Sequence, residues 1–379
     1  GGLSGGLGGG SGFDGLVEDV FFDGGSGFGG VGLHGGSFVL EDPPAFGVHR
    51  VAVLLTKEPG SVMPDLPNLD LIMGLVRDYY LDISGGRTLI EWVVFGPYDL
   101  PVVGDYKSVP EVDRDIDFTE FQHLMIVDSR YVHPTASVTY VLHSSDDGLT
   151  LIGKMMIPSI YFMLGSAPNY IYQRAETIAH EFGHNFGARH ADFLDCGDKY
   201  VDVFENCVVG EYGDSLDVMG GSTNLFSEIR GMNALFLSRV GFIDDSRVTV
   251  VDSGGVYDLV PLGSDGGVVL LKVLKKGGLS GVDEDYYYLE YRVPRGRDEA
   301  VLGVFGTPYA VYVRTMKSGI GLLSDDSLLI DMVPGNFRGI IWVFDGLQQG
   351  MLFVDPVTGL RMMTVVADEF GAKVKVEYC

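Results

Sequence analysis

The chain has 379 residues, of which 46% are hydrophobic, and a formal net charge of −26. This length allows two compact domains, and the hydrophobic content excludes a wholly disordered protein. The acidic balance, without a basic stripe, argues against nucleic acid and anionic membrane surfaces as partners. No apolar stretch reaches the roughly 18 residues that a membrane-spanning helix needs, so we expect no membrane span.

Residues 1–46 differ in composition from everything that follows. Seventeen of the first 36 residues are Gly, interleaved with Phe, Leu and Ser. A stretch with so much conformational entropy and so little to bury is predicted to be a flexible arm. Its candidate anchors, on its own chain or on a neighbouring copy, are Phe13, Phe21, Phe22 and Phe28. The arm is therefore one route to a homo-oligomer.

Between His49 and residue 246, strand-like and helix-like segments alternate. Short apolar runs predict strands at Val51–Leu55, Thr88–Phe95, Phe121–Val127, Val138–Leu142 and Lys154–Phe162. Helical periodicity is present at Leu69–Leu81, and a second helix is expected at Tyr170–Phe186. This order predicts an α/β domain over residues 47–246, with a twisted, mostly parallel sheet beneath the second helix.

The end of the second predicted helix carries the most informative run, His-Glu-Phe-Gly-His-Asn-Phe-Gly-Ala-Arg-His at residues 180–190. His180 and His184 are four residues apart, so on a helix they share a face and can bind one ion. Glu181 lies one position further round and can reach a water on that ion without being a ligand. The alternative is a chance occurrence, which five fixed positions in eleven make rare.

The residues after this pair supply a third nitrogen. Gly187 permits a sharp backbone turn that a residue with a Cβ would resist, and the turn brings His190 back toward the pair. Three neutral imidazoles with one open coordination position are typical of a catalytic zinc rather than a closed structural one. The remaining histidines show no ligand spacing and are predicted to be surface or core polar groups: His34, His49, His123, His133 and His143.

Cysteines and acidic residues cluster just after the third histidine. Cys196 and Cys207 are eleven residues apart, and we expect a disulfide between them, with two buried thiols as the alternative. A disulfide suits an extracellular or cell-surface protein, whereas Cys379 has no obvious partner. Three acidic residues follow closely: Asp192, Asp195 and Asp198. One of them orients a ligand imidazole, or they help to bind Ca²⁺ together with Asp202, or they form a solvated loop. The sequence leaves these three alternatives open.

From about residue 247 the pattern changes to short alternating strands separated by Gly and Asp turns. The predicted strands are Val248–Val251, Val268–Val273, Tyr286–Tyr291, Ala310–Arg314, Leu328–Met332, Gly339–Phe344, Met362–Val366 and Lys373–Tyr378. Eight short strands with little helix predict an all-β, sandwich-like domain over residues 247–379. It shows no catalytic constellation, so we expect a packing or substrate-presenting role.

The run at residues 180–190, followed by a methionine, resembles the pattern of the metzincin metalloproteases. Met219 stands 29 residues after His190 and matches their Met-turn; ordinary core packing is the alternative for this methionine. Softer similarities point to gametolysin-like peptidases, in the segments Val51–Leu55, Asp78–Arg87, Phe226–Phe242, Tyr287–Arg292 and Leu328–Gly335. The resemblance spans about residues 47 to 379, and only the histidine run and the Met-turn are highly specific.

This resemblance implies a metzincin-like catalytic domain, with a twisted mixed sheet and an active-site helix. In metzincins an edge strand of the sheet pairs with an extended peptide substrate, and Leu149–Phe162 is the predicted place for it here. Some metzincins also carry a tyrosine two residues after the Met-turn methionine that assists the oxyanion. That position is Gly221 in this chain, and Tyr212 is a distant substitute.

The predicted function is therefore a zinc-dependent endopeptidase. His180, His184 and His190 hold one Zn²⁺, and Glu181 is the general base for a water that attacks a protein or peptide substrate. A second hypothesis is a surface structural or assembly protein on a metzincin scaffold, in which the Gly-rich arm mediates self-association. A third is a zinc hydrolase that acts on non-protein amides. The intact histidine run with Glu181 favours the peptidase.

Overall fold

The computed structural model describes residues 46–131, 133–136, 141–145, 148–163, 168–221, 225–275, 285–316, 325–334 and 345–378, and the pairs 32–33 and 36–37. Nearly all of the predicted arm, the predicted strand Gly339–Phe344 and Cys379 lie outside the described residues. The two pairs form the short antiparallel strands β1 (Gly32–Leu33) and β2 (Gly36–Ser37). None of the described helices is long and apolar enough to cross a bilayer.

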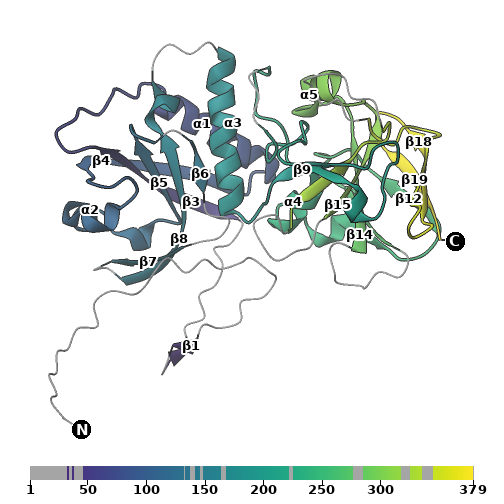
Figure 1. Cartoon of the computed structure of the whole chain (residues 1–379), viewed down its shortest axis with the longest axis horizontal. Helices are drawn as coiled ribbons and strands as arrows, with labels where there is room; N and C mark the ends of the chain where they lie inside the picture. The colour runs from purple at the N-terminus through teal and green to yellow at the C-terminus, as the bar shows by residue number, and fades with distance from the viewer. Residues whose placement is uncertain are drawn as a thin grey trace, which may run out of the picture.

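The first half of the described chain is built on a six-stranded mixed sheet (Figure 1). Its members are β3 (Gly47–Lys57), β4 (Thr88–Asp99), β5 (His123–Asp128), β6 (Thr135–Ala136), β7 (Val141–Ser145) and β8 (Gly148–Pro158). β4, β3, β5 and β8 are parallel neighbours in that order, and β6 and β7 pair antiparallel with β8. The predicted mixed sheet is confirmed.

Alternating side chains of the central strand β3 fill two different cores, as the two-residue period of a strand requires. Val51 and Val53 pack on the face that is covered by α1 (Leu69–Ile83) and α3 (Pro168–Asn185). Ala52 and Leu54 pack on the opposite face, against the segment that contains α2 (Pro110–Asp115). The helices predicted at Leu69–Leu81 and Tyr170–Phe186 are confirmed to within two residues.

The prediction that Leu149–Phe162 provides a free edge strand was wrong. This segment forms β8, which is bonded to β5 on one side and to β6 and β7 on the other. The edge beyond β8 is the two-residue strand β6, which is too short to be recognised from an apolar pattern. The other edge of the sheet is β4, whose only described partner strand is β3.

The second half of the chain contains two further sheets. One is seven-stranded, in the order β10-β9-β16-β15-β14-β13-β11, and the other is four-stranded, in the order β12-β19-β18-β17. The larger sheet consists of β9 (Ala191–Asp195), β10 (Val208–Gly210), β11 (Val248–Val251), β13 (Leu270–Leu274), β14 (Tyr286–Arg292), β15 (Ala310–Met316) and β16 (Ser327–Ile330). The smaller sheet consists of β12 (Gly255–Leu259), β17 (Leu352–Val354), β18 (Arg361–Ala367) and β19 (Ala372–Glu377).

The two sheets of this half share one apolar core. Leu289 of β14 and Val313 of β15 meet Phe353, Met362 and Val374 of the smaller sheet in this core. The other face of the larger sheet is turned toward the first half of the chain, where Tyr286 and Tyr288 join the core beneath α3. Two short helices lie in this region, α4 (Ala234–Arg239) and α5 (Asp298–Phe305), and α5 was not predicted.

The larger sheet crosses the predicted domain boundary at residue 246. Its strands β9 and β10 precede this residue, whereas its other five strands follow it. β9 pairs in parallel with β16, which lies more than 130 residues later in the chain. The division into residues 47–246 and 247–379 stays a prediction, but the sheet itself is shared between the two parts.

Candidate metal centre

The helix α3 ends in the predicted histidine run and stands between the two halves of the chain (Figure 1). His180 and His184 lie on the same face of this helix, one turn apart, with their ring centroids 4.7 Å from each other. Gly187 has φ +97°, which is the left-handed conformation that favours glycine. The turn predicted at this glycine is therefore present, and it returns the chain toward the helix.

The structure brings the three predicted ligand histidines together. One nitrogen of His180, one of His184 and one of His190 all lie within 4.8 Å of one another. Among the described residues this is the only group of three or more His, Cys, Asp or Glu side chains close enough to share a metal ion. Two of the rings are buried and the third is half-buried, so the cluster is shielded from bulk solvent on most sides.

Backbone carbonyls fix the orientation of two of these rings. His180 donates from Nδ1 to the carbonyl of Val218 (3.0 Å), and His184 donates from Nδ1 to the carbonyl of Ala188 (2.9 Å). Because the protonated nitrogen of each ring is committed to a carbonyl, Nε2 of each ring carries the free lone pair. These two bonds select the tautomer that a metal site requires.

The third histidine is held by the C-terminal strands. His190 immediately precedes β9, and its backbone N–H donates to Asp326 Oδ1 (3.1 Å), while its carbonyl accepts from the N–H of Ser327 (3.0 Å). Asp326 and Ser327 lie at the start of β16. The start of β16 thus holds the backbone that carries one of the three imidazoles, a role that nothing in the local sequence around His190 indicates.

Met219 lies beneath the cluster. Its side chain is fully buried and packs closely on α3, with Met219 Sδ against Gly183. Gly183 lies between the two helical histidines, and its lack of a Cβ leaves the space that the Met219 side chain occupies. The backbone carbonyl of Met219 also accepts from the N–H of Ala191, next to His190 (3.0 Å).

Burial sets the charge state of the site. It lowers the pKa of His180 to about 4 and the pKa of His184 and of His190 to about 3, with the neighbouring imidazoles adding to the effect. Burial also raises the pKa of Glu181 to about 8. The three imidazoles are therefore neutral at pH 7 and free to bind a cation. A cation bound beside Glu181 favours its ionised form.

Tyr212, which is distant in sequence, lies at the site. Its ring centroid is 4.1 Å from that of His190 and 6.0 Å from that of His180. Tyr212 has φ +56°, which is unusual for a residue with a side chain. Two hydrogen bonds maintain this backbone: its N–H donates to Asp192 Oδ1 (2.7 Å), and its carbonyl accepts from the N–H of Gly221 (2.8 Å).

Two buried carboxyl groups hold backbone segments that border the histidine cluster. Asp192 holds the backbone of Tyr212 and Asp326 holds that of His190, and each has a second carboxyl oxygen without a hydrogen-bond partner. Burial raises the pKa of Asp192 to about 7 and that of Asp326 to about 6. Orientation of a ligand imidazole was one of three alternatives for the acidic residues that include Asp192. Asp192 instead accepts from the backbone N–H of Tyr212. Asp326 was not predicted at all.

The acidic loop that follows is closed by the predicted disulfide. Cys196 and Cys207 are bonded, with their Cα atoms 4.2 Å apart. Asp195 accepts from the N–H of Gly197, and Asp202 accepts from Lys199, Asn206 and the N–H of Val203. These carboxylates are engaged within the loop, and the described residues give the suggested Ca²⁺ site no support.

A second pair of buried histidines lies near the C-terminal end of α3 but outside the cluster. A hydrogen bond of 3.1 Å joins His49 Nδ1 and His123 Nε2, and Asn185 Nδ2 lies 3.4 Å from His123 Nδ1. Burial, followed by the charge of His49, lowers the pKa of His123 well below its ordinary value. This pair is a core polar pair, as the sequence predicted.

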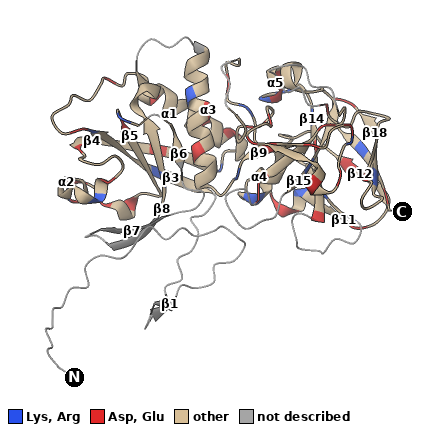
Figure 2. Cartoon of the chain, viewed as in Figure 1, with Lys and Arg blue, Asp and Glu red and all other residues tan. Residues whose placement is uncertain are grey.

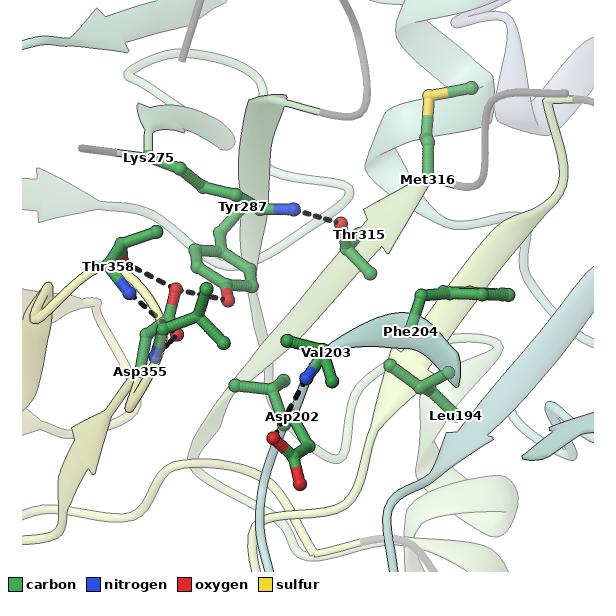
Figure 3. A pocket seen from close by; sticks show the side chains of 12 residues that line it. Leu194, Asp202, Val203, Phe204, Lys275, Tyr287, Thr315, Met316, Asp355 and Thr358 are labelled. Carbon is green, nitrogen blue, oxygen red and sulfur yellow. Dashed lines mark hydrogen bonds between the residues drawn. The ribbon is translucent and has the colours of Figure 1, made fainter. Parts of the chain in front are cut away.

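A cavity of about 410 Å³ lies in the second half of the chain (Figure 3). Tyr287 and Asp355 meet on one side of it through a hydrogen bond of 2.9 Å, and Phe204 lies on the other side. Lys275 and Met316 at its rim adjoin residues 276–284 and 317–324, which lie outside the described residues. None of the three clustered imidazoles lines this cavity, so it is separate from the candidate metal centre.

In comparison with known protein families, one family model matches part of this sequence. The sequence model of the metallopeptidase family M12B, reprolysin-like, matches residues 105–191, a segment that contains His180, Glu181, His184 and His190. No curated protein matches the chain. The family match covers less than half of the chain, so it supports a metallopeptidase-like segment at residues 105–191 and does not assign the whole protein to the family.

Solved structures give only remote similarities. Archaemetzincin from Methanopyrus kandleri is 12% identical over 51% of this chain and 93% of its own, with a TM-score of 0.30. Wild-type OgpA from Akkermansia muciniphila is 11% identical over 90% of this chain and 95% of its own (TM-score 0.29). Catalytically inactive OgpA in complex with an O-glycopeptide substrate is 12% identical over 67% and 72% (TM-score 0.27). These values are too low to carry an argument, and the gametolysin-like branch stays a prediction.

Proposed function

We propose that this protein is a zinc-dependent endopeptidase of the metzincin type. The observation that carries the proposal is the convergence of three neutral imidazoles, from His180, His184 and His190, within 4.8 Å at the end of α3. Neutral nitrogen donors suit Zn²⁺, and three protein ligands leave one position open for chemistry. The metallopeptidase match over residues 105–191 supports the same reading.

The chain's own groups fit hydrolysis of a peptide bond. When bound, zinc lowers the pKa of a water molecule and polarises the carbonyl under attack. Glu181 lies on α3 directly after the first ligand, is 5% exposed, and is the only described acidic side chain at this end of the helix. Its carboxylate accepts the proton of the attacking water and then delivers it to the leaving amine.

Two further features are assigned as parts of the substrate site. The edge strand β6 is antiparallel to β8, and its outer edge can pair with an extended peptide by strand addition. The Tyr212 ring lies beside those of His190 and His180, and its phenol is a hydrogen-bond donor. In some metzincins a tyrosine at the position of Gly221 assists the oxyanion. We assign this role to Tyr212 here.

The proposed location is extracellular or at the cell surface, with protein or peptide substrates. The disulfide between Cys196 and Cys207 supports it, because such bonds persist in oxidising compartments. Acidic positions lie over both halves of the described chain, with basic positions interspersed (Figure 2). This distribution of charged positions is consistent with the net charge of −26.

The low pKa values of the three imidazoles predict how zinc binding depends on pH. Protons compete with zinc for these nitrogens only near the pKa values of about 4, 3 and 3 in the free protein. In the Glu181→Gln variant the carboxyl with a pKa of about 8 no longer titrates, so only the imidazoles compete with zinc for protons. We therefore expect the zinc affinity of this variant to stay nearly constant from pH 8 down to about 5.5 and to fall steeply below about pH 4.5. Competition with a chromophoric chelator across this range measures it. A tenfold loss of affinity between pH 7.5 and 6 would contradict the prediction.

The function is tested on the purified full chain. We expect one zinc per chain by elemental analysis, and cleavage of casein and of a quenched-fluorescence peptide. Phenanthroline should abolish the cleavage, and added zinc should restore it, whereas added calcium should not. A zinc-loaded protein that cleaves small amides but no peptide would favour the alternative of a non-protein amide hydrolase. A zinc-loaded protein that cleaves neither would overturn the proposal.

A further inference from the structure

Three fully buried arginines surround the loop that lies beneath the candidate metal centre. This loop, residues 214–221, contains Met219. Arg230, Arg292 and Arg314 are 0%, 0% and 1% exposed, although arginine is almost never found so deeply buried without partners. Arg292 and Arg314 come from the neighbouring strands β14 and β15, in the part of the chain where the sequence showed no catalytic constellation.

Arg230 connects the loop to α3. Its guanidinium donates to Glu176 Oε1 from Nε (3.2 Å) and from one terminal nitrogen (2.7 Å), and Glu176 lies one helical turn before His180. The same guanidinium donates to the carbonyl of Ser215 (2.8 Å) and to that of Gly221 (2.6 Å). Both ends of the loop are thus attached to the helix that carries the first two histidines.

Arg292 and Arg314 connect the same loop to the C-terminal sheet. Arg292 donates to the carbonyl of Leu216 (3.1 Å), to Glu290 Oε1 (2.9 Å) and to Asp298 Oδ1 (3.0 Å). Arg314 pairs with Asp214 and with Glu290 (3.2 Å). Asp214 in turn accepts from the N–H of Leu216 (2.9 Å), so its carboxylate shapes the first turn of the loop.

The loop transmits this arrangement to the metal centre. Asp217 accepts from the N–H of Met219 (2.7 Å), and the next carbonyl along the loop, that of Val218, accepts from His180 Nδ1 (3.0 Å). A shift of the loop by one ångström would break this bond to the imidazole or misalign it. The tautomer and the direction of the His180 ring therefore depend on where the loop lies.

The strand period explains how the sheet reaches the site. In β14 the side chains of Tyr287, Leu289 and Tyr291 fill the core between the two C-terminal sheets. The intervening positions face the first half of the chain, and they include Glu290 and Arg292. The ion pairs of Arg292 and Arg314 therefore lie on the side of the sheet that faces the metal-centre loop, not on the side of the sandwich core.

We infer that Arg292 and Arg314 are positioning residues for the metal centre: they hold residues 214–221 so that the Val218 carbonyl keeps His180 oriented for metal binding. The inference rests on the proposed zinc site and extends it, because it makes the C-terminal sheet part of that site. Charged groups suit this task, since a buried carboxylate such as Asp214 cannot move away from the guanidinium of Arg314 without a large energetic cost.

The test compares zinc binding by the full-length protein and by three variants. Arg314→Met removes the charge, and Arg314→Lys keeps the charge but not the planar set of donors. The matched control is Tyr287→Phe, which removes a buried hydrogen bond to Asp355 on the opposite face of the same sheet. For each, we measure zinc affinity by chelator competition, the absorption spectrum of the cobalt-substituted protein, and the melting temperature of the metal-free form.

We expect Arg314→Met to bind zinc up to about 10 to 100-fold more weakly, with altered cobalt bands, because loss of the hydrogen-bond partner of a ligating histidine, here the Val218 carbonyl, has an effect of this size. Arg314→Lys should recover part of the affinity, and Tyr287→Phe should lower the melting temperature without changing zinc affinity or spectrum. If Arg314→Met does not fold, Arg314→Lys still tests the inference through its affinity and spectrum. Unchanged zinc affinity and spectrum in the folded Arg314 variants would overturn the inference.

The outcomes also separate this inference from the proposed function. If the unaltered protein binds zinc but cleaves no peptide, the proposed peptidase function fails and the positioning role is still decided by the affinities. If the unaltered protein binds no zinc, both fail together.

Discussion

Replacement of Glu181 by Gln is expected to lower kcat by about 10² to 10⁴-fold while zinc remains bound, because a positioned general base contributes about that much to the rate. Glu181 is 5% exposed and follows the first ligand histidine on α3, so glutamine fits the same space without a proton-accepting carboxylate. The measurement is kcat and KM on a quenched-fluorescence peptide, together with zinc content.

A second variant at the same position sharpens this test. Glu181→Asp keeps a carboxylate on a side chain that is one methylene shorter, and we expect a rate between those of the unaltered protein and Glu181→Gln. A Glu181→Gln protein with near-normal turnover and full zinc content would remove Glu181 from the role of base. Loss of zinc from this variant would instead make the carboxylate a ligand.

Replacement of His184 by Ala is expected to abolish both zinc binding at micromolar concentrations and peptide cleavage. Peptides with four zinc ligands bind zinc with a free energy of about 10–16 kcal/mol, which is about 3 kcal/mol for each ligand. Loss of one ligand should therefore lower the affinity about 10²-fold. His184 is central to the cluster, with its ring centroid 4.7 Å from that of His180 and 4.9 Å from that of His190. Elemental analysis and chelator competition measure the loss.

The control for this variant is a histidine that is equally buried but lies outside the cluster. His123 is 0% exposed and hydrogen-bonds to His49 beneath the end of α3. We expect His123→Ala to lower the melting temperature through the cavity and the lost hydrogen bond, yet to keep one zinc per chain. Equal loss of zinc from the two variants would show that general destabilisation, rather than the loss of a ligand, explains His184→Ala.

Several features of the candidate site were predictable because they depend on local periodicity. The spacing of His180 and His184 is enough to place them on one face of a helix, and only the helix has to form for the pair to meet. Gly187 predicted the turn that returns His190, and its φ of +97° is the conformation expected of it. The disulfide between Cys196 and Cys207 was likewise predictable from their closeness in the sequence.

The errors came from contacts between distant segments. The segment at Leu149–Phe162 looks like an edge strand because its apolar pattern says nothing about its neighbours, and the true edge, Thr135–Ala136, has only two residues. Tyr212 was named only as a distant substitute for a tyrosine after the Met-turn; the structure does not contradict this choice, and its ring centroid lies 4.1 Å from that of His190. Separation along the chain was a poor guide to separation in space at both places.

The sequence by itself determined the donor set: three imidazoles and one carboxylic acid at fixed helical and turn spacings, together with the alternation of strands and helices around them. The tertiary structure alone decided what holds these groups in place. The carbonyl of Val218 orients His180, and Asp326 holds the backbone of His190. Arg292 and Arg314 hold the Met219 loop from strands β14 and β15, which lie 70 residues or more away along the chain. The physical reason is that spacing along a helix or turn is set by covalent geometry, whereas hydrogen bonds and ion pairs between strands depend on which segments pack together, and no local pattern encodes this choice.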